Sequence, residues 1–303
     1  MSDRRTLAID AGQTGIRARV GVDDVFEVSG IRTDLALEPQ LAAVVADALG
    51  RDLVFDAVAV GSSGFTLEAT AAADLLALTE HSGVRRAAIA HDSVTSFLGA
   101  LGDSTGALVA AGTGVVTLAV GVSRVARVDG WGYIMGDAGS GWWIGRAALE
   151  AVMRAYDGRG PVTALTAVVE AEFPNLEAAY IQLQSDDGRV RRVASFAKAV
   201  GDLAATDPVA LAICEAAGAE LAVSVITALR RVEQHVEPSP IVCVLGNVMR
   251  SAAISRSFET MLSAELPGVD VRGPIGTGLD GAGLLFDLAP DSALRELVVV
   301  AGD

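Results

Sequence analysis

The sequence predicts an α/β protein built from two similar lobes, and three observations support this prediction. The chain has 303 residues, which is enough for about two domains. A run of three short strand-like segments with a glycine- and threonine-containing turn occurs twice, at residues 6–28 and at 107–128. After each run, strand-like segments alternate with helical ones, which is typical of parallel sheets. We therefore expect an internal duplication in which each lobe presents a phosphate-binding turn to a shared cleft.

The first repeat begins with a buried strand at residues 6–10, which ends in Asp10. Its other expected elements are strands at 16–22, 25–28, 56–61 and 86–90 and helices at 39–49, 66–78 and 93–101. Ligands bind outside the carboxyl ends of parallel strands. Asp92 follows the strand at 86–90, so it is either a catalytic base or the N-cap of the next helix.

The second repeat follows a polar break at residues 102–106, which is a candidate domain boundary. Its expected elements are strands at 107–111, 115–120, 123–128, 241–245 and 269–272 and helices at 147–156 and 255–266. The region 163–235 has a helical pattern interrupted by a few breaks, and we expect its alanine-rich part, 208–236, to be a core or interface helix.

Two turns in the repeats have the composition of phosphate-binding loops. In the first, Gly12 exposes backbone N–H groups, Thr14 adds a hydroxyl, and Asp10 can hold Mg²⁺ through water. Ordinary hairpin turns use the same residue types, so this turn alone leaves both interpretations open. The turn Gly112-Thr113-Gly114 repeats the pattern in the second half of the chain.

The most unusual stretch of the chain is residues 130–145, which hold six glycines, all three tryptophans of the protein and the carboxylate of Asp137. Glycines at this density let the backbone approach another group closely. A tight loop before a helix is the simpler interpretation. Together with the phosphate turns, the stretch instead favours a ligand-binding loop of a two-lobed phosphotransferase.

Residues 276–281 match the glycine spacing of dinucleotide-binding loops, but only 22 residues follow them. That is too few for the rest of a dinucleotide-binding unit. A glycine-rich helix start that admits a flat nucleotide base fits better. The chain has no Gly-Lys-Ser/Thr sequence of the P-loop type.

The composition narrows the class of partner. A net charge of −15 argues against nucleic-acid and anionic-membrane surfaces, and 51% hydrophobic residues provide for a large core. We expect no apolar run of membrane-spanning length and no signal peptide. Cys214 and Cys243 are expected to be buried free thiols of a cytoplasmic protein, and the three histidines lack metal-ligand spacing.

Taken together, these motifs resemble the BadF/BadG/BcrA/BcrD family of actin/hexokinase-type ATPases, whose best-known sugar kinase is N-acetylglucosamine kinase. The resemblance covers the whole chain, and its most specific part is Gly-Trp-Gly followed by Gly-Asp-x-Gly-Ser at 130–140. The other matching motifs are Asp10-Ala-Gly-Gln-Thr14, Asp92, Ala111-Gly-Thr-Gly114, Leu245-Gly-Asn-Val248 and 274–283.

The resemblance implies two ribonuclease-H-like lobes around a central cleft. The first would comprise 1–103 plus about 281–303, and the second 104–280 with a helical insertion. It also implies an ATP- and Mg²⁺-dependent kinase of carbohydrate metabolism that phosphorylates the 6-hydroxyl of an amino sugar, glucosamine or N-acetylglucosamine.

The resemblance also implies roles for individual residues. Asp92 would be the general base and Asp10 the metal-linked carboxylate. Nucleotide contacts would be Gly12, Gln13, Thr14, Gly112, Thr113, Gly114, Gly246, Asn247, Gly276, Gly278 and Gly281. Sugar contacts would be Asp34, Ser63, Gly64, Val115, Trp131, Gly132 and Asp137.

Two departures from the family pattern bear on the sugar. Val115-Val116 replace polar residues after the second turn, and Asp34 stands where N-acetylglucosamine kinases tend to have Asn. A carboxylate can hold the ammonium group of glucosamine by a charge-assisted hydrogen bond. We therefore expect glucosamine to be accepted at least as well as N-acetylglucosamine, unless Asp34 is a solvated loop residue.

Two other functions stay open at this point. Dehydratase activators of the same family couple ATP hydrolysis to electron transfer through an iron–sulfur cluster, which needs cysteine ligands. A sugar sensor on a kinase scaffold is the second alternative. A homodimer through the helical second lobe is also expected.

Overall fold

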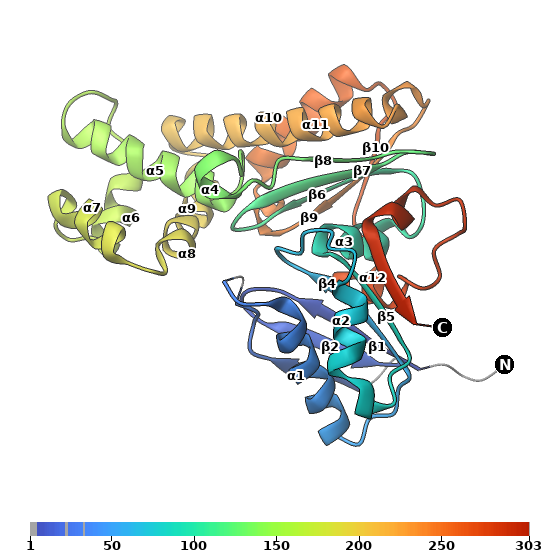
Figure 1. Ribbon diagram of the computed structural model, residues 1–303. Coiled ribbons are helices and arrows are strands. Elements are labelled where there is room, and N and C mark those ends of the chain that lie inside the picture. Colours follow the sequence, from blue (N-terminus) through green and yellow to red (C-terminus); the bar gives the residue numbers. More distant parts are fainter. Residues whose placement is uncertain (1–4, 22–23, 33, 303) are drawn as a thin grey trace. The chain divides into compact units, whose positions relative to one another are not determined.

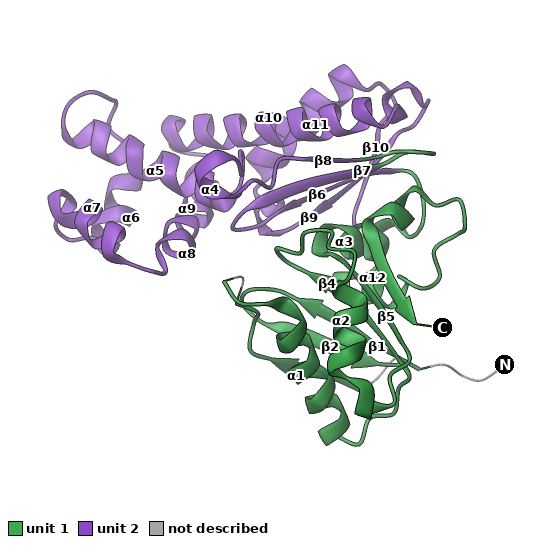
Figure 2. Ribbon diagram, in the orientation of Figure 1, with its two compact units in different colours: residues 1–105, 120–125, 274–303 green, residues 106–119, 126–273 purple. Residues whose placement is uncertain are grey.

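The computed structural model describes residues 5–21, 24–32 and 34–302. The chain divides into two compact units (Figure 2). Unit 1 comprises Met1–Thr105, Val120–Val125 and Pro274–Asp303, and unit 2 comprises Gly106–Ala119 and Ala126–Gly273.

Unit 1 contains a six-stranded sheet in the order β11-β5-β4-β1-β2-β3 (Figure 1). Its strands are β1 (Thr6–Ala11), β2 (Ile16–Val20), β3 (Asp24–Val28), β4 (Ala57–Ser62), β5 (Arg86–His91) and β11 (Val298–Gly302). β1, β4 and β5 are parallel, whereas β2, β3 and β11 each run antiparallel to a neighbour. The helices are α1 (Leu37–Gly50), α2 (Ala71–Leu78), α3 (Asp92–Leu101) and α12 (Gly278–Gly283).

Alternating side chains of β1 pack on opposite faces of this sheet. Leu7 and Ile9 belong to the core cluster that α1 and α2 cover. Ala8 packs instead with Leu279 and Ala282 of α12. Because successive strand residues point to opposite faces, Asp10 lies on the α12 face with Ala8.

Unit 2 contains a five-stranded sheet in the order β10-β9-β6-β7-β8, in which β6, β9 and β10 are parallel. Its strands are β6 (Gly106–Ala111), β7 (Val115–Val120), β8 (Val125–Val128), β9 (Ile241–Leu245) and β10 (Asp270–Arg272). Its helices are α4 (Gly132–Met135), α5 (Gly141–Tyr156), α6 (Leu165–Glu172), α7 (Leu176–Ser185), α8 (Arg189–Ala194), α9 (Phe196–Leu203), α10 (Pro208–Arg231) and α11 (Ala252–Glu265).

The two sheets share one strand order, which confirms the predicted α/β fold with two related lobes. β5-β4-β1-β2-β3 of unit 1 corresponds position by position to β10-β9-β6-β7-β8 of unit 2. The additional strand of unit 1 is β11, which the sequence analysis missed. It pairs with β5 from a distant part of the chain, so no local pattern marks the partner.

Several boundaries differ from the expected ones. α5 begins at Gly141 rather than at 147, because Ser140 Oγ accepts a hydrogen bond from Trp143 N and caps the helix. α2 begins at Ala71 rather than at 66, where its buried alanines start. Residues 274–280 group with unit 1 rather than with the second lobe. Val22, within the expected strand at 16–22, lies outside the described residues.

α10 corrects the expectation that no apolar run reaches membrane-spanning length. It has 24 residues and, in the described part of the chain, is the one helix long and apolar enough to cross a membrane by length and composition. Its inner face carries Cys214, Leu221 and Leu229, which belong to the core of unit 2. This burial agrees with the expected core helix.

α12 packs against α3 with almost no space between their backbones. A β-carbon on Gly281 would overlap the carbonyl oxygen of Thr95, and one on Gly99 would overlap that of Thr277. These glycines therefore allow α12 to lie directly on the helix that begins with Asp92.

We predict that Gly281→Ala lowers the free energy of unfolding by about 1–3 kcal/mol, because the added methyl group forces α3 and α12 apart. Gly283→Ala in the same helix is the matched control, since its β-carbon would meet only Ala8 Cβ, at 3.9 Å. Thermal and urea unfolding of both variants measure the effect. Equal stability of the two variants would show that the helices separate without cost.

Candidate active site

Three parallel strands of unit 1 end at the same level. Their register pairs Ala11 of β1 with Ser62 of β4, and Ser62 with His91 of β5. Asp10, Ser63 and Asp92 therefore lie at one edge of the sheet. This is the edge at which ligands bind in sheets of this kind.

Asp92 is the first residue of α3 and carries a hydrogen-bonded carboxylate. Ser63 Oγ donates to its Oδ2 at 2.5 Å, and His91 Nδ1 lies 2.9 Å from its Oδ1. Burial raises the pKa of Asp92. The contacts with His91 and Ser63 lower it by more than burial raises it, so the net pKa lies below the usual aspartate value. The result is a carboxylate that is mostly buried and ionised at neutral pH.

The capping role for Asp92 is taken by its neighbour. His91 is the N-cap residue of α3, with φ of −64° and ψ of 145°, and Asp92 is the first residue inside the helix. Asp92 is therefore not the N-cap of its own helix, and its role as a base stays a prediction.

Asp10 lies near the end of β1 in an electrostatically unfavourable place. Burial raises its pKa, the negative charge of Asp92 raises it further, and Arg17 lowers it. A β-carbon on Gly278 would lie 3.2 Å from Asp10 Oδ2. A side chain at residue 278 would therefore be tightly packed against this carboxylate.

The first predicted phosphate turn is a closed loop that neighbouring backbone supports. Gly12 N donates to Gly15 O at 3.1 Å, and Ile31 N donates to Gly12 O at 3.0 Å. Gln13 and Thr14 lie at the tip, where both are exposed. The turn thus leaves its tip open to a ligand.

The predicted sugar contacts in unit 1 lie in two segments. Ser63 N donates to Ala11 O at 3.0 Å, which ties the segment with Gly64 to the end of β1. Asp34 is exposed and forms an ion pair with Arg32, with 2.7 Å between Nη2 and Oδ2. The hydrogen bond from Arg32 lowers the pKa of Asp34, so this carboxylate already has a cationic partner.

The second phosphate turn lies at the beginning of α5. Gly112 N donates to Gly114 O at 2.9 Å, and Gly141 N and Trp142 N donate to Gly112 O and Thr113 O at 2.8 and 3.0 Å. These bonds fix the turn against the helix start.

Asp137 lies next to this turn. Its Oδ1 accepts from Val115 N at 3.4 Å, and its backbone is in the left-handed region with φ of 61°. Burial is the main cause that raises the pKa of Asp137. Trp131 and Gly132, the other predicted sugar contacts of unit 2, are exposed.

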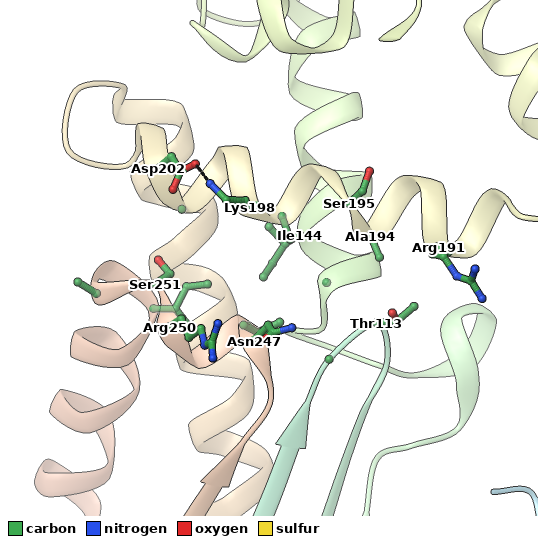
Figure 3. Close-up of a pocket in the computed structure, with 17 residues that line it drawn as sticks. Thr113, Ile144, Arg191, Ala194, Ser195, Lys198, Asp202, Asn247, Arg250 and Ser251 are labelled. Carbon is green, nitrogen blue, oxygen red and sulfur yellow. Dashed lines mark hydrogen bonds and ion pairs between the residues drawn. The ribbon is translucent and has the colours of Figure 1, made fainter. Parts of the chain in front are cut away.

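Unit 2 also contains a pocket of about 610 Å³ (Figure 3). Gly112, Thr113 and Gly141 form its phosphate-turn side. The segment after β9 and helices α8 and α9 form the remaining wall, through Asn247, Arg250, Ser251, Arg191, Ser195 and Lys198. This volume lies within the range of small-molecule sites.

The structure groups the predicted nucleotide residues differently from the sequence analysis. Gly112, Thr113 and Asn247 line the pocket. Gly246 supports it, because its close approach to Ala111 and its φ of 98° set the direction of Asn247. Gly276, Gly278 and Gly281 belong to unit 1 and do not line this pocket.

The structure shows a packing role for Gly281, and its expected place beside a nucleotide stays a prediction. It is buried against α3, so the space that its missing side chain leaves is filled by helix backbone. Arg250, Ser251 and Lys198 were missed because they lie on helices or turns without a recognisable motif.

Among the described residues, no group of three or more His, Cys, Asp or Glu side chains could hold a metal ion by itself. Cys214 and Cys243 are buried free thiols in unit 2, as predicted. Burial raises the pKa of Cys243 to about 11 and also raises that of Cys214.

Curated relatives match only part of the chain. It is 36% identical over 78 residues to an N-acetylmuramic acid/N-acetylglucosamine kinase of Clostridium acetobutylicum, covering 25% of this chain and 26% of that protein. It is 40% identical over 72 residues to an N-acetyl-D-glucosamine kinase of Dictyostelium discoideum, covering 23% of each chain. The matched segments thus span about a quarter of these relatives.

Similarity of fold extends over nearly the whole chain. A crystal structure assigned as an N-acetylglucosamine kinase from Chromobacterium violaceum has a TM-score of 0.70 at 24% identity, covering 93% of this chain and 98% of that one. The sequence model of the BadF/BadG/BcrA/BcrD ATPase family matches residues 39–284. Since this match includes most of the 303 residues, the chain belongs to the BadF/BadG/BcrA/BcrD ATPase family.

Proposed function

We propose that this protein is an ATP-dependent sugar kinase that transfers the γ-phosphoryl group to the 6-hydroxyl of an amino sugar, glucosamine or N-acetylglucosamine. The observation that carries the proposal is the ionised carboxylate of Asp92, held by Ser63 at the strand ends of unit 1. Family membership and the names of the two curated relatives support it.

Asp92 has the properties of a general base for this reaction. Its carboxylate accepts the proton of the sugar hydroxyl while the hydroxyl oxygen forms a bond to the γ-phosphorus. The bond from phosphorus to the bridging oxygen breaks, and ADP leaves with that oxygen. Ser63 contacts Oδ2 and His91 contacts Oδ1, and each oxygen keeps a second lone pair that could accept the hydroxyl proton.

The region around Asp10 fits a divalent cation. A buried carboxylate next to a second carboxylate is costly when both are ionised, and a nearby cation would relieve that cost. Asp10 would hold Mg²⁺ through water, and the ion would neutralise charge on the transferred phosphoryl group. Gly12, Gln13 and Thr14 would contact phosphate oxygens at the exposed tip of the first turn.

Unit 2 would supply the nucleotide site. The 610 Å³ pocket adjoins the Gly112–Gly114 turn, so a nucleoside in the pocket would direct its phosphates to that turn. Backbone N–H groups hold phosphates without a need for lysines, which agrees with the acidic composition. Trp131, Gly132 and Asp137 would contact the sugar.

A panel of hexoses and amino sugars with Mg-ATP tests this proposal, read as ADP release and as the phosphorylated position by ³¹P NMR. We expect the largest kcat/KM with an amino sugar and a 6-phosphate product. ATP hydrolysis that no sugar accelerates would favour the dehydratase-activator alternative. Sugar binding without turnover would favour the sensor. Sedimentation of the same preparation tests the expected homodimer.

Asp92→Asn should reduce turnover by roughly 10²–10⁴-fold, because the amide cannot accept the hydroxyl proton. Nucleotide binding should change little, since the pocket lies in unit 2. Steady-state kinetics and calorimetric ATP titration measure the two effects. A folded variant with near-normal turnover would remove Asp92 from the reaction.

Asp10→Asn should raise the Mg²⁺ concentration needed for half-maximal turnover and lower the maximal rate, while sugar affinity changes little. The variant removes the carboxylate that we assign to the metal. Turnover measured over a Mg²⁺ series at several sugar concentrations gives both parameters. Loss of sugar affinity with an unchanged Mg²⁺ dependence would contradict the assignment.

Glucosamine should be accepted at least as well as N-acetylglucosamine, provided that Asp34 contacts the 2-amino group. Since Arg32 already pairs with Asp34, we expect the preference to be nearer tenfold than a hundredfold. The kcat/KM for glucosamine divided by that for N-acetylglucosamine should fall in Asp34→Asn. The same ratio should rise in Arg32→Ala. A strong preference of the wild type for the acetylated sugar, or ratios unaffected by both variants, would exclude this role.

A further inference from the structure

We propose that Asp129 is a positioning residue that holds the loop 130–138 in the shape that presents Trp131, Gly132 and Asp137 to the acceptor sugar. The proposal rests on the sugar-kinase function above and adds a residue outside the sugar-contacting set. Asp129 acts through the loop backbone, all of which lies in unit 2.

The carboxylate of Asp129 ties both ends of the loop together. Its Oδ1 accepts from Gly130 N at 2.7 Å and from Asp137 N at 2.8 Å. Its Oδ2 accepts from Ala138 N at 2.9 Å. Hydrogen bonds to an ionised acceptor are stronger than those between neutral groups. One side chain thus closes the loop between its first residue and its last two.

The local backbone is adapted to this arrangement. Asp129 has φ of 59°, in the left-handed region that aspartate tolerates better than most residues with side chains. A β-carbon on Gly136 would overlap Asp129 Oδ1. Glycine at 136 therefore lets the returning backbone pass close to the carboxylate.

Arg127 fixes the same loop from β8. It donates from Nη2 to Gly130 O and from Nε to Asp129 O at 3.3 Å. Its guanidinium lies over the ring of Trp131, 4.7 Å from the centroid. Trp131 is nevertheless 56% exposed, so its ring remains accessible to a ligand.

The loop needs such fixed ends because its own packing is weak. Ile134 and Met135 of α4 are each 81% exposed. A four-residue helix is not stable by itself. In the middle of the loop, the ring of Tyr133 packs edge-on against that of Trp142, with 4.8 Å between the ring centroids. Without Asp129, the exposed apolar side chains would favour other, more buried shapes of the loop.

Asp129→Gly tests the proposal, because glycine removes all three hydrogen bonds and adopts the observed φ without strain. We expect the sugar kcat/KM to fall by roughly 10–10²-fold through a higher sugar KM, while the KM for ATP stays within about twofold. Chymotrypsin should cleave after Trp131 and Tyr133 faster than in the wild type, with the sites identified by mass spectrometry.

Asp129→Asn provides a second variant that is closer to the wild type. It keeps the oxygen that accepts from Gly130 N and Asp137 N and loses the acceptor for Ala138 N, so both effects should be intermediate. Asp157→Asn is the matched control, since Asp157 Oδ1 also accepts a backbone bond, from Arg159 N at 3.2 Å, in an exposed turn of unit 2. It should change neither quantity.

Unchanged cleavage in both Asp129 variants would overturn the proposal, whatever the enzyme phosphorylates. Faster cleavage with an unchanged sugar KM would also overturn it, because the shape of the loop would then not matter to the acceptor. A wild type without sugar-dependent ADP release would contradict the kinase function itself. The cleavage rates would still show whether Asp129 holds the loop 130–138 in shape.

Discussion

The contacts of the Asp92 carboxylate with Ser63 and His91 are the constraint on which the candidate base of unit 1 depends. Its burial would favour the protonated acid, and the contacts from Ser63 and His91 reverse that preference. These contacts require the parallel register that ends β4 and β5 at one level. They also require α3 to begin at this level. Gly61 permits this, because a β-carbon at 61 would overlap Thr95 Oγ1. Gly61 thus helps to determine where Asp92, the proposed base, lies.

Unit 2 has the same strand order as unit 1, but different groups follow the ends of its parallel strands. Where unit 1 ends its parallel strands in acidic and hydroxyl side chains, unit 2 ends them in turns and a pocket. The Gly112–Gly114 turn is held by N–H groups at the start of α5, so its position depends on the Ser140 cap as well as on β6. The two units thus share the arrangement of their strands and differ in the loops and turns that follow those strands.

The sequence was sufficient for the architecture because its signals were local and repeated. Asp10, Asp92 and the two glycine turns follow directly from strand ends. β11 was not predictable in this way, because it pairs antiparallel with β5 across about two thirds of the chain. Asp129 was missed for a similar reason, since two of its three hydrogen bonds reach eight and nine residues ahead. Gly281 shows a further limit: glycine marks a close approach, but the sequence does not say whether to a ligand or to a helix.

The pH dependence of kcat/KM for the sugar in wild type and Ser63→Ala tests most directly whether hydrogen bonding keeps Asp92 ionised. A base whose pKa is lowered stays active at acidic pH, and its activity falls only as the pH drops through that pKa. Loss of the Ser63 bond should raise the pKa of Asp92, so the acid limb of the variant should lie at higher pH than that of the wild type. Superimposable acid limbs would show that the Ser63 contact does not set the ionisation of the base.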